Sequence, residues 1–299
     1  MKLQPVTTLD DLASAVGRGI ITLVYGRTGV GKTVCSMAYS PDPVLYLAME
    51  KRDYKHPLRV ATETKGKMIK FQAAHYTDTI SFIQILDDII FHPEKYLYHG
   101  KNGDEPFATI IVDSLTHFVT VDLPEELSAQ AEAERRSSKK TTAKELVSMT
   151  KMSEESYGAF AAHSVRIVNQ LGTLAQEYGM NIVITALTEN NPRWGRMYDV
   201  APALAGKAFP KVLPGFCDLI GYIDDRYVRV DNGDGTFSTK LAYPPWIFFE
   251  SLPDNHFMCK KTGIKLAKCP YNLGKILESF DMDKAAKDKL LRLETGEDG

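Results

Sequence analysis

Residues 26–33 read GRTGVGKT and match the pattern G-x-x-x-x-G-K-[ST] at every fixed position. The glycines Gly26, Gly29 and Gly31 allow the backbone to curl, so that successive N–H groups face phosphate oxygens. Residues 20–25 (IITLVY), which precede the motif, have the β-branched apolar character of a buried strand. An ordinary glycine turn would account for the glycines, but not for the strand candidate that leads directly into them. The sequence therefore predicts a phosphate-binding loop.

The last two residues of the motif carry the side-chain chemistry. Lys32 is placed to reach the β- and γ-phosphates and to stabilise phosphoryl charge, and the Thr33 hydroxyl can ligate Mg²⁺. A helix is expected over residues 34–39, and its N-terminal end presents partial positive charge to the same phosphates. We therefore expect ATP and Mg²⁺ as cofactors. The expected ATP-binding residues are Gly26, Arg27, Thr28, Gly29, Val30, Gly31, Lys32 and Thr33.

Two carboxylates at the ends of apolar runs are candidates for metal binding and for hydrolysis. Asp113 ends the run ATIIVD and is predicted to hold Mg²⁺ together with Thr33. Hydrolysis also needs a group that orients water, and Ser114, which follows Asp113, does not supply it. Glu50 ends the run VLYLAME, where open α/β sheets place ligand-facing residues, so Glu50 is the expected catalytic carboxylate. The alternative is a solvent-exposed Glu50 that begins a charged loop.

Apolar strand candidates alternate with amphipathic helix candidates along the chain. Helical spacing of apolar residues predicts helices over residues 79–91 and about 160–178, the second capped by Gly179. This alternation is typical of an α/β protein with a mostly parallel sheet flanked by helices, and the β-rich second half predicts antiparallel strands toward the C-terminus. The strand candidates are residues 20–25, 43–49, 68–73, 108–112, 181–187, 218–223, 226–230 and 246–249.

We predict a single domain over residues 1–280, since neither an internal repeat nor a Gly/Ser- or Pro-rich linker divides the chain. Within it, the polar stretches 122–156 and 188–211 are expected to be mobile loops. Residues 281–299 are expected to form a charged C-terminal tail.

The composition is that of an ordinary globular protein, with 44% apolar and 25% charged residues, which excludes a disordered or collagen-like chain. The formal net charge of −2 creates no global positive field, so a nucleic acid would need a local basic patch. Four cysteines and seven histidines are too scattered for a zinc site or a disulfide framework. Because the chain has neither a run of about eighteen apolar residues nor a signal-peptide core, we expect no membrane partner and a cytoplasmic location, in the host cytoplasm for a phage-encoded chain.

The series of motifs resembles the ATPase core of the RecA/KaiC superfamily, over roughly residues 8–280. In RecA-like proteins the strand after the phosphate-loop helix ends in the catalytic Glu, and the metal-binding strand reads apolar–Asp–Ser. The segments that carry this resemblance are TLDDLASAVGRGIITLVYGRTGVGKT, LAME and TIIVDSL. Further segments are similar to compact RecA-like ATPases of phages, some of which are single-strand annealing recombinases of the Sak type. These segments are Tyr157-Gly158, NIVITAL, PALAGKAF and CDLIGYID.

The resemblance implies a homo-oligomer, a ring or a filament, whose sites are completed by a Lys/Arg finger from the neighbouring subunit. MCKKTG occupies a similar place, so Lys260 or Lys261 is the implied finger, although Cys259 stands where the superfamily has a Lys. RecA proteins also close the NIVITAL-type strand with a Gln that senses the γ-phosphate. Here Thr188 and Glu189 follow instead.

Local basic clusters are candidates for contact with single-stranded DNA. Residues 135–144 and 255–277 carry only basic charges, and residues 191–198 (NPRWGRMY) interleave arginines with aromatics. Stacking of bases on aromatic rings with arginines on phosphates is the usual pattern of single-strand binding. The alternatives are solvated charged faces and a surface loop whose Trp packs on its own domain. The expected DNA-binding residues are Arg193, Trp194, Arg196, Tyr198, Lys207, Lys139 and Lys140.

These predictions combine into a Mg²⁺-dependent ATPase that hydrolyses ATP to ADP and phosphate and acts on single-stranded DNA in phage-type recombination or replication. One alternative is a KaiC-like regulatory or assembly ATPase whose partner is a protein. Another is a small-molecule kinase with the same phosphate loop, for which Arg135 and Arg136 give thin support as an arginine-rich lid.

Overall fold

The computed structural model describes residues 19–49, 53–75, 79–101, 103–125, 127, 154–190, 192, 198–204, 209–233 and 236–281. Of the predicted loop 122–156, residues 126 and 128–153 lie outside these ranges, whereas residues 154–156 are helical; of the predicted tail 281–299, all but residue 281 lies outside.

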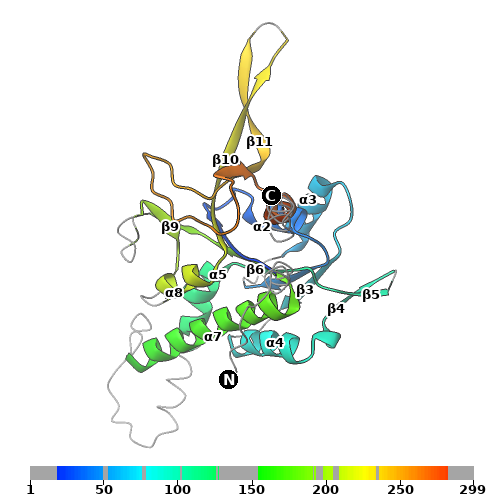
Figure 1. The fold of residues 1–299 in the computed structure, drawn as a ribbon, viewed down its shortest axis with the longest axis vertical. Coiled ribbons are helices and arrows are strands. Elements are labelled where there is room, and N and C mark those ends of the chain that lie inside the picture. Colours follow the sequence, from blue (N-terminus) through cyan, green and yellow to red (C-terminus); the bar gives the residue numbers. More distant parts are fainter. Residues whose placement is uncertain are drawn as a thin grey trace, which may run out of the picture.

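A mixed sheet of nine strands forms the centre of the described part of the chain (Figure 1). Its order is β13-β11-β10-β1-β7-β6-β2-β3, with β12 paired to the start of β10. The strands from β10 to β3 run parallel to one another, whereas β11, β12 and β13 are antiparallel to their neighbours. This architecture confirms the predicted fold class. The strands are β1 (Ile21–Gly26), β2 (Val44–Ala48), β3 (Phe71–His75), β6 (Thr109–Asp113), β7 (Asn181–Ala186), β10 (Leu219–Asp231), β11 (Phe237–Phe248), β12 (Lys260–Lys261) and β13 (Lys268–Pro270).

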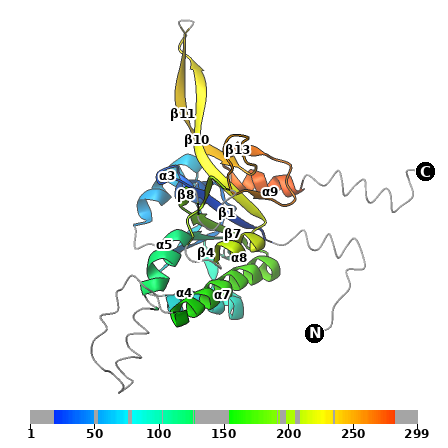
Figure 2. The ribbon, with the colours of Figure 1, turned by 90° about the vertical axis from the view of Figure 1, so that its left-hand side faces the viewer.

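Helices cover both faces of the sheet (Figure 2). One core cluster contains Phe82, Leu171 and Leu213 from α4, α7 and α8, and the other contains residues of α2, α3 and α9. Because both faces are buried, the central strands are continuous apolar runs rather than alternating ones. The helices are α2 (Lys32–Tyr39), α3 (Lys55–Lys65), α4 (Thr79–Phe91), α5 (Leu115–His117), α7 (Glu154–Tyr178), α8 (Phe209–Phe216) and α9 (Leu273–Asp281), with the short helical segments η2 (Pro93–Lys95) and η3 (Phe118–Asp122).

The order of the parallel strands determines where a ligand can bind. The strand β7 lies between β1, which leads into the phosphate loop, and β6, which ends at Asp113. Since parallel strands point the same way, the carboxyl ends of β1, β6 and β2 meet at one edge of the sheet. This edge is where open α/β sheets bind their ligands.

The strands β10 and β11 continue beyond the sheet as a two-stranded arm, the yellow hairpin at the top of Figure 1. We define the arm as Arg226–Asp231 together with Phe237–Ala242. None of its residues is buried, and Tyr227, Phe237 and Leu241 are largely exposed. Two smaller hairpins are separate from the main sheet: β4 (Leu97–Gly100) with β5 (Gly103–Pro106), and β8 (Thr188–Asn190) with β9 (Val200–Pro202).

Most predicted elements are present, with shifts where tertiary pairing overrides the local pattern. The helix 79–91 has the predicted bounds, and Gly179 follows α7 with φ +68°, as expected for a C-terminal cap. The strand predicted over 68–73 lies at Phe71–His75, because its pairing with β2 begins at Phe71 and Met68 is exposed. The two strands predicted over 218–223 and 226–230 form one strand, β10.

Among the helices of the described residues, none has both the length and the apolar character needed to cross a lipid bilayer.

Candidate nucleotide-binding site

The loop between β1 and α2 has the conformation of an anion cradle. Gly29 and Gly31 have φ values of +81° and +97°, in the left-handed region that side chains disfavour. Gly31 is also the N-cap of α2, so the positive end of the helix faces the loop. At Gly26 a Cβ would lie 2.7 Å from the carbonyl oxygen of Ile223, which is too close for any other residue. All three glycines of the motif are therefore required by the backbone.

Lys32 lies against the loop that it follows. Its Nζ donates hydrogen bonds to the carbonyl oxygens of Gly26, at 2.8 Å, and Arg27, at 2.9 Å, and the side chain is largely buried. The ammonium group is thus held at the place where the motif would receive phosphates.

Thr33 and Asp113, the two predicted metal residues, are in direct contact. The Thr33 hydroxyl donates to Oδ2 of Asp113 at 2.6 Å, although the residues are 80 positions apart in the chain. The contact arises because α2 starts at the carboxyl end of β1 and Asp113 stands at the carboxyl end of β6. The structure therefore brings Lys32, Thr33 and Asp113 together at one edge of the sheet.

Two further hydroxyls contact Asp113, and sequence reasoning missed both. Tyr46 Oη donates to Oδ2 at 2.8 Å from β2, and the Thr185 hydroxyl donates to Oδ1 from β7. Each belongs to a strand that is otherwise almost wholly aliphatic. A hydroxyl in such a strand needs a partner when it is buried, and this is the signal that could have identified Tyr46 and Thr185.

Glu50, the expected catalytic carboxylate, lies outside the described residues. Its neighbourhood is defined by the strand before it: Ala48 is the register partner of Asp113, and the backbone N–H of Met49 donates to the carbonyl oxygen of Asp113 at 2.8 Å. The catalytic role of Glu50 stays a prediction.

Three residues next to the arm, Asp224, Asp225 and Tyr243, which we call its base, contact the phosphate loop or the start of α2. Arg27 forms an ion pair with Asp225 and a longer one, 3.8 Å, with Asp224. The Cys35 thiol donates to Tyr243 Oη at 3.0 Å. Burial raises the pKa of Cys35 to about 12, so the thiol stays protonated and can donate at neutral pH.

Most of the expected DNA-binding residues lie outside the described residues: Arg193, Trp194, Arg196, Lys207, Lys139 and Lys140. Tyr198 is described and packs, half-buried, against the core cluster of α4, α7 and α8. The hydroxyl of Thr116 holds the two residues that flank the β8–β9 hairpin, because it accepts from the N–H of Leu187 and donates to the carbonyl oxygen of Ala203, both at 2.9 Å. Thr116 is three residues after Asp113, so this loop starts and ends beside the candidate nucleotide site.

The implied finger residues have partners within their own chain. Lys260 donates to the carbonyl oxygens of Pro214 and Gly215, and Lys261 forms an ion pair with Glu250. A role in a neighbouring subunit would require these contacts to open, and it stays a prediction.

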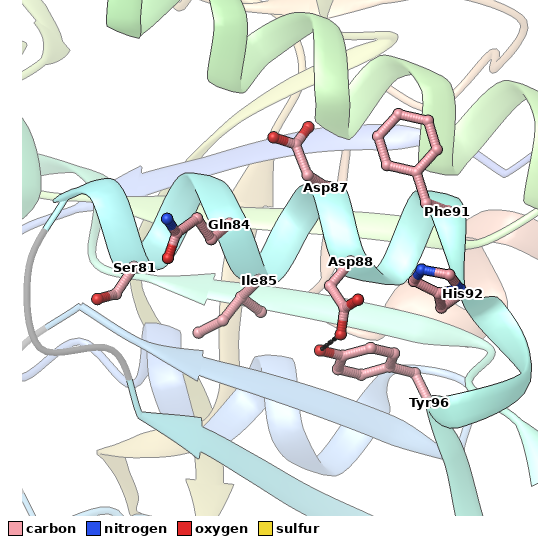
Figure 3. Close-up of a pocket in the computed structure, with 8 residues that line it drawn as sticks. All are labelled: Ser81, Gln84, Ile85, Asp87, Asp88, Phe91, His92 and Tyr96. Atoms are coloured by element: carbon pink, nitrogen blue, oxygen red, sulfur yellow. Dashed lines mark hydrogen bonds between the residues drawn. The ribbon is translucent and has the colours of Figure 1, made fainter.

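A pocket with a cavity volume of about 560 Å³ lies away from this site, between α4 and the residues His92 and Tyr96 that flank η2 (Figure 3). Both carboxylates of its lining have partners: Tyr96 Oη donates to Asp88 at 2.7 Å, and Asp87 is paired with Arg166. None of its lining residues belongs to the phosphate loop or to β6.

The donor set of the site fits a nucleotide with its Mg²⁺. A glycine cradle at a helix N-terminus with a buried lysine suits phosphate oxygens, and a hydroxyl beside a carboxylate offers the hard oxygen ligands that Mg²⁺ prefers. Bound Mg²⁺ would supply positive charge to the β- and γ-phosphates.

A P-loop at the carboxyl edge of a mostly parallel sheet, with Asp113 beside Thr33, defines a P-loop nucleotide-binding protein. Residues 18–241 match the AAA-domain family (AAA_24), and the chain belongs to this family. It is thus an AAA-type P-loop ATPase domain. A crystal structure of the RadB recombinase is similar, with 16% sequence identity, a TM-score of 0.41, and coverage of 77% of this chain and 85% of that chain. No protein of curated function matches the sequence significantly.

Proposed function

We propose that this protein is a Mg²⁺-dependent ATPase that acts on single-stranded DNA in phage-type recombination or replication. The binding of ATP and Mg²⁺ is supported by the cluster of Lys32, Thr33 and Asp113, in which the Thr33 hydroxyl is 2.6 Å from the Asp113 carboxylate. In this proposal Lys32 stabilises phosphoryl charge, Thr33 and Asp113 hold Mg²⁺, and Glu50 orients the attacking water.

The DNA part of the proposal is supported by the segment 191–198 and by its anchoring. Its sequence interleaves arginines with Trp194 and Tyr198, which suits stacking of bases beside phosphate contacts. Leu187 and Ala203, which flank the β8–β9 hairpin around this segment, are both hydrogen-bonded to Thr116, close to Asp113 in sequence. A strand of DNA on this segment would therefore act close to the nucleotide.

We also propose that the chain forms a homo-oligomer, a ring or a filament, in which Lys260 or Lys261 completes a neighbour's site. The two lysines form β12, an antiparallel strand at the start of β10, and their present partners are two carbonyl oxygens and one carboxylate. Size-exclusion chromatography with light scattering, with and without ATP, tests this assembly. A monomer under both conditions contradicts it.

Steady-state ATP hydrolysis with Mg²⁺ tests the enzymatic part. We expect Lys32→Ala to abolish nucleotide binding or turnover, and Glu50→Gln to bind ATP but to hydrolyse it poorly. Lys95→Ala and Glu94→Gln, which alter exposed side chains of η2, are matched controls and should behave as the wild type. Normal hydrolysis by Glu50→Gln would show that another group orients the water.

The same assay with oligo(dT) at low and at high salt tests the DNA part. Stimulation that fades as salt rises supports phosphate contacts, because such contacts release counterions. Replacing Arg193 and Arg196 by Ala should remove the stimulation and leave the basal rate unchanged. A rate that is indifferent to DNA at both salt concentrations contradicts a DNA-directed ATPase.

A KaiC-like regulatory ATPase with a protein partner is the second candidate. It is favoured by the net charge of −2 and by the exposed apolar residues of the arm, Tyr227, Phe237 and Leu241. Turnover that ignores DNA while the Lys32→Ala variant is inactive would support this second function.

A further inference from the structure

The phosphate loop is held from outside its own motif by the base of the arm. A Cβ placed on Gly31 would lie 3.2 Å from Cε2 and 3.6 Å from Oη of Tyr243. The Tyr243 ring therefore packs directly on the backbone of the loop, at the residue where the loop becomes α2. This contact depends on the folded structure, since Gly31 and Tyr243 are 212 positions apart in the chain.

One hydrogen bond holds the ring in this position and a second holds the backbone of Tyr243. Tyr243 Oη accepts from the thiol of Cys35, one turn into α2, and the Tyr243 carbonyl oxygen accepts from Nη2 of Arg226 at 2.9 Å. Tyr243 is 44% exposed, but burial of its hydroxyl end and the nearby thiol raise its pKa still further above neutral, so the hydroxyl carries its proton at pH 7. The contact thus joins β10, β11 and the start of α2 into one unit.

The opposite end of the loop is held by the other strand of the arm. Arg27 is paired with Asp225 and Asp224, which end the part of β10 that lies in the main sheet. Tyr227 Oη also donates to Asp225, at 3.2 Å. Both ends of the glycine-rich turn are therefore attached to the base of one hairpin.

We propose that Tyr243 is a positioning residue of the nucleotide site, which holds the phosphate loop in its binding conformation through Gly31, and that it couples nucleotide binding to the arm. A loop with three glycines has many conformations to lose when it binds phosphates. A contact that restricts the loop beforehand reduces that loss and increases affinity. This inference rests on the proposed binding of nucleotide.

Binding of a non-hydrolysable ATP analogue with Mg²⁺, measured by calorimetry, tests the role of Tyr243. We expect Tyr243→Ala to raise the Kd about tenfold, because the loop is no longer restricted. Tyr243→Phe keeps the ring and should stay within about twofold of the wild type. Leu241→Ala, on the same strand and two residues away, removes an exposed side chain of the arm and should leave the Kd unchanged.

Steady-state kinetics separate positioning from a general loss of structure. The KM for ATP should rise about tenfold in Tyr243→Ala while kcat stays within about threefold, because Asp113 and Glu50 are not altered. Lower thermal stability of the ligand-free protein with an unchanged Kd would mean a merely structural role and would overturn the proposal.

The coupling has its own readout, because the chain contains two tryptophans and Trp246, three residues after Tyr243 on β11, has the guanidinium of Arg226, the first residue of the arm, over its ring at 5.7 Å. In a Trp194→Phe protein, Trp246 emission should change when the ATP analogue binds. Unchanged emission upon demonstrated binding overturns the coupling, even if Tyr243→Ala does not fold. If the wild type binds no nucleotide, the proposed function itself is wrong and this inference falls with it. Wild-type binding with an unchanged Kd in Tyr243→Ala overturns the inference alone.

Discussion

The carboxylate of Asp113 is the most densely contacted group of the candidate site. Hydroxyls of Thr33, Tyr46 and Thr185 donate to it from α2, β2 and β7. Three donors from three elements fix the direction of both carboxylate oxygens, and hydrogen bonds to a charged acceptor are the stronger kind. The orientation of the proposed metal ligand is therefore set by residues outside the motifs.

Tyr46→Phe tests this arrangement, because it removes one donor and keeps the ring. We expect the free energy of unfolding to fall by about 2 kcal/mol and the Mg²⁺ concentration for half-maximal hydrolysis to rise severalfold. The readouts are urea unfolding and a Mg²⁺ titration. Tyr96→Phe is the matched control, since Tyr96 makes the same kind of bond to Asp88, at 2.7 Å, away from the site. An unchanged Mg²⁺ titration in Tyr46→Phe contradicts the positioning of Asp113 by Tyr46.

Gly31 combines a φ of +97° with close contact to Tyr243, so a methyl group there meets both backbone strain and a clash. We expect Gly31→Ala to lower the free energy of unfolding by more than about 1 kcal/mol and to weaken nucleotide binding. Gly172→Ala is the opposite control: this glycine lies inside α7 with open space around a new Cβ. At Gly172 the substitution should raise the free energy of unfolding by about 0.5–1 kcal/mol, measured by urea unfolding. Equal changes in the free energy of unfolding for Gly31→Ala and Gly172→Ala would show that the left-handed conformation of Gly31 does not matter for stability.

At the scale of elements, the local sequence pattern predicts the bounds of a helix or strand well where the signal lies in that element's own residues. The helix α4 and the strands β1, β2 and β6 lie within one residue of their predicted bounds, because apolar runs and helical spacing are local signals. The arm was predicted only in part, since residues 237–245 (FSTKLAYPP) lack regular apolar alternation and are a strand by virtue of pairing with β10. The same limit applies to the site. Motif spacing indicates Lys32, Thr33 and Asp113, whereas the contacts of Tyr243 depend on the folded sheet.

The end of α3 is attached to the start of β2 by an ion pair, which gives the fold an acid-sensitive contact. Asp42 and Lys65 are 3.3 Å apart and both are largely buried. Burial alone would raise the pKa of Asp42, but attraction by Lys65 and hydrogen bonds outweigh it and lower this pKa. A lowered carboxyl pKa means that the contribution to stability is present above about pH 4 and is lost as pH falls through the native pKa.

Urea unfolding of Asp42→Asn as a function of pH tests this contribution. The variant should be less stable than the wild type at pH 7, and the difference should shrink as pH falls below about 4, because the wild type then loses the same interaction. Glu63→Gln removes an exposed carboxylate whose distance to Arg59 is 3.9 Å, and its pH curve should follow the wild type. A difference between Asp42→Asn and wild type that is constant from pH 7 to pH 2 contradicts the assignment.

At the scale of the whole molecule, the main sheet and the arm share one strand, β10. Its first residues pair with β1 inside the core, and its last ones pair only with β11 in the arm. The switch falls at Asp224 and Asp225, the residues that contact Arg27 of the phosphate loop. The exposed arm and the two aspartates that contact the phosphate loop are thus consecutive parts of one strand, so a partner bound to the arm would act within a few residues of these contacts.

The arm can be removed without touching its base, and this separates its contribution to folding from its role in the site. Arg226 and Ala242 are register partners, so replacing residues 227–241 by Asn-Gly closes the hairpin with a two-residue turn. We expect the shortened chain to fold with a free energy of unfolding within about 1 kcal/mol of the wild type, because an isolated two-stranded ribbon contributes little stability. It should also bind the ATP analogue with the wild-type Kd, since Tyr243 and Asp225 remain. Loss of nucleotide binding by this folded protein would mean that the outer arm, and not only its base, holds the phosphate loop.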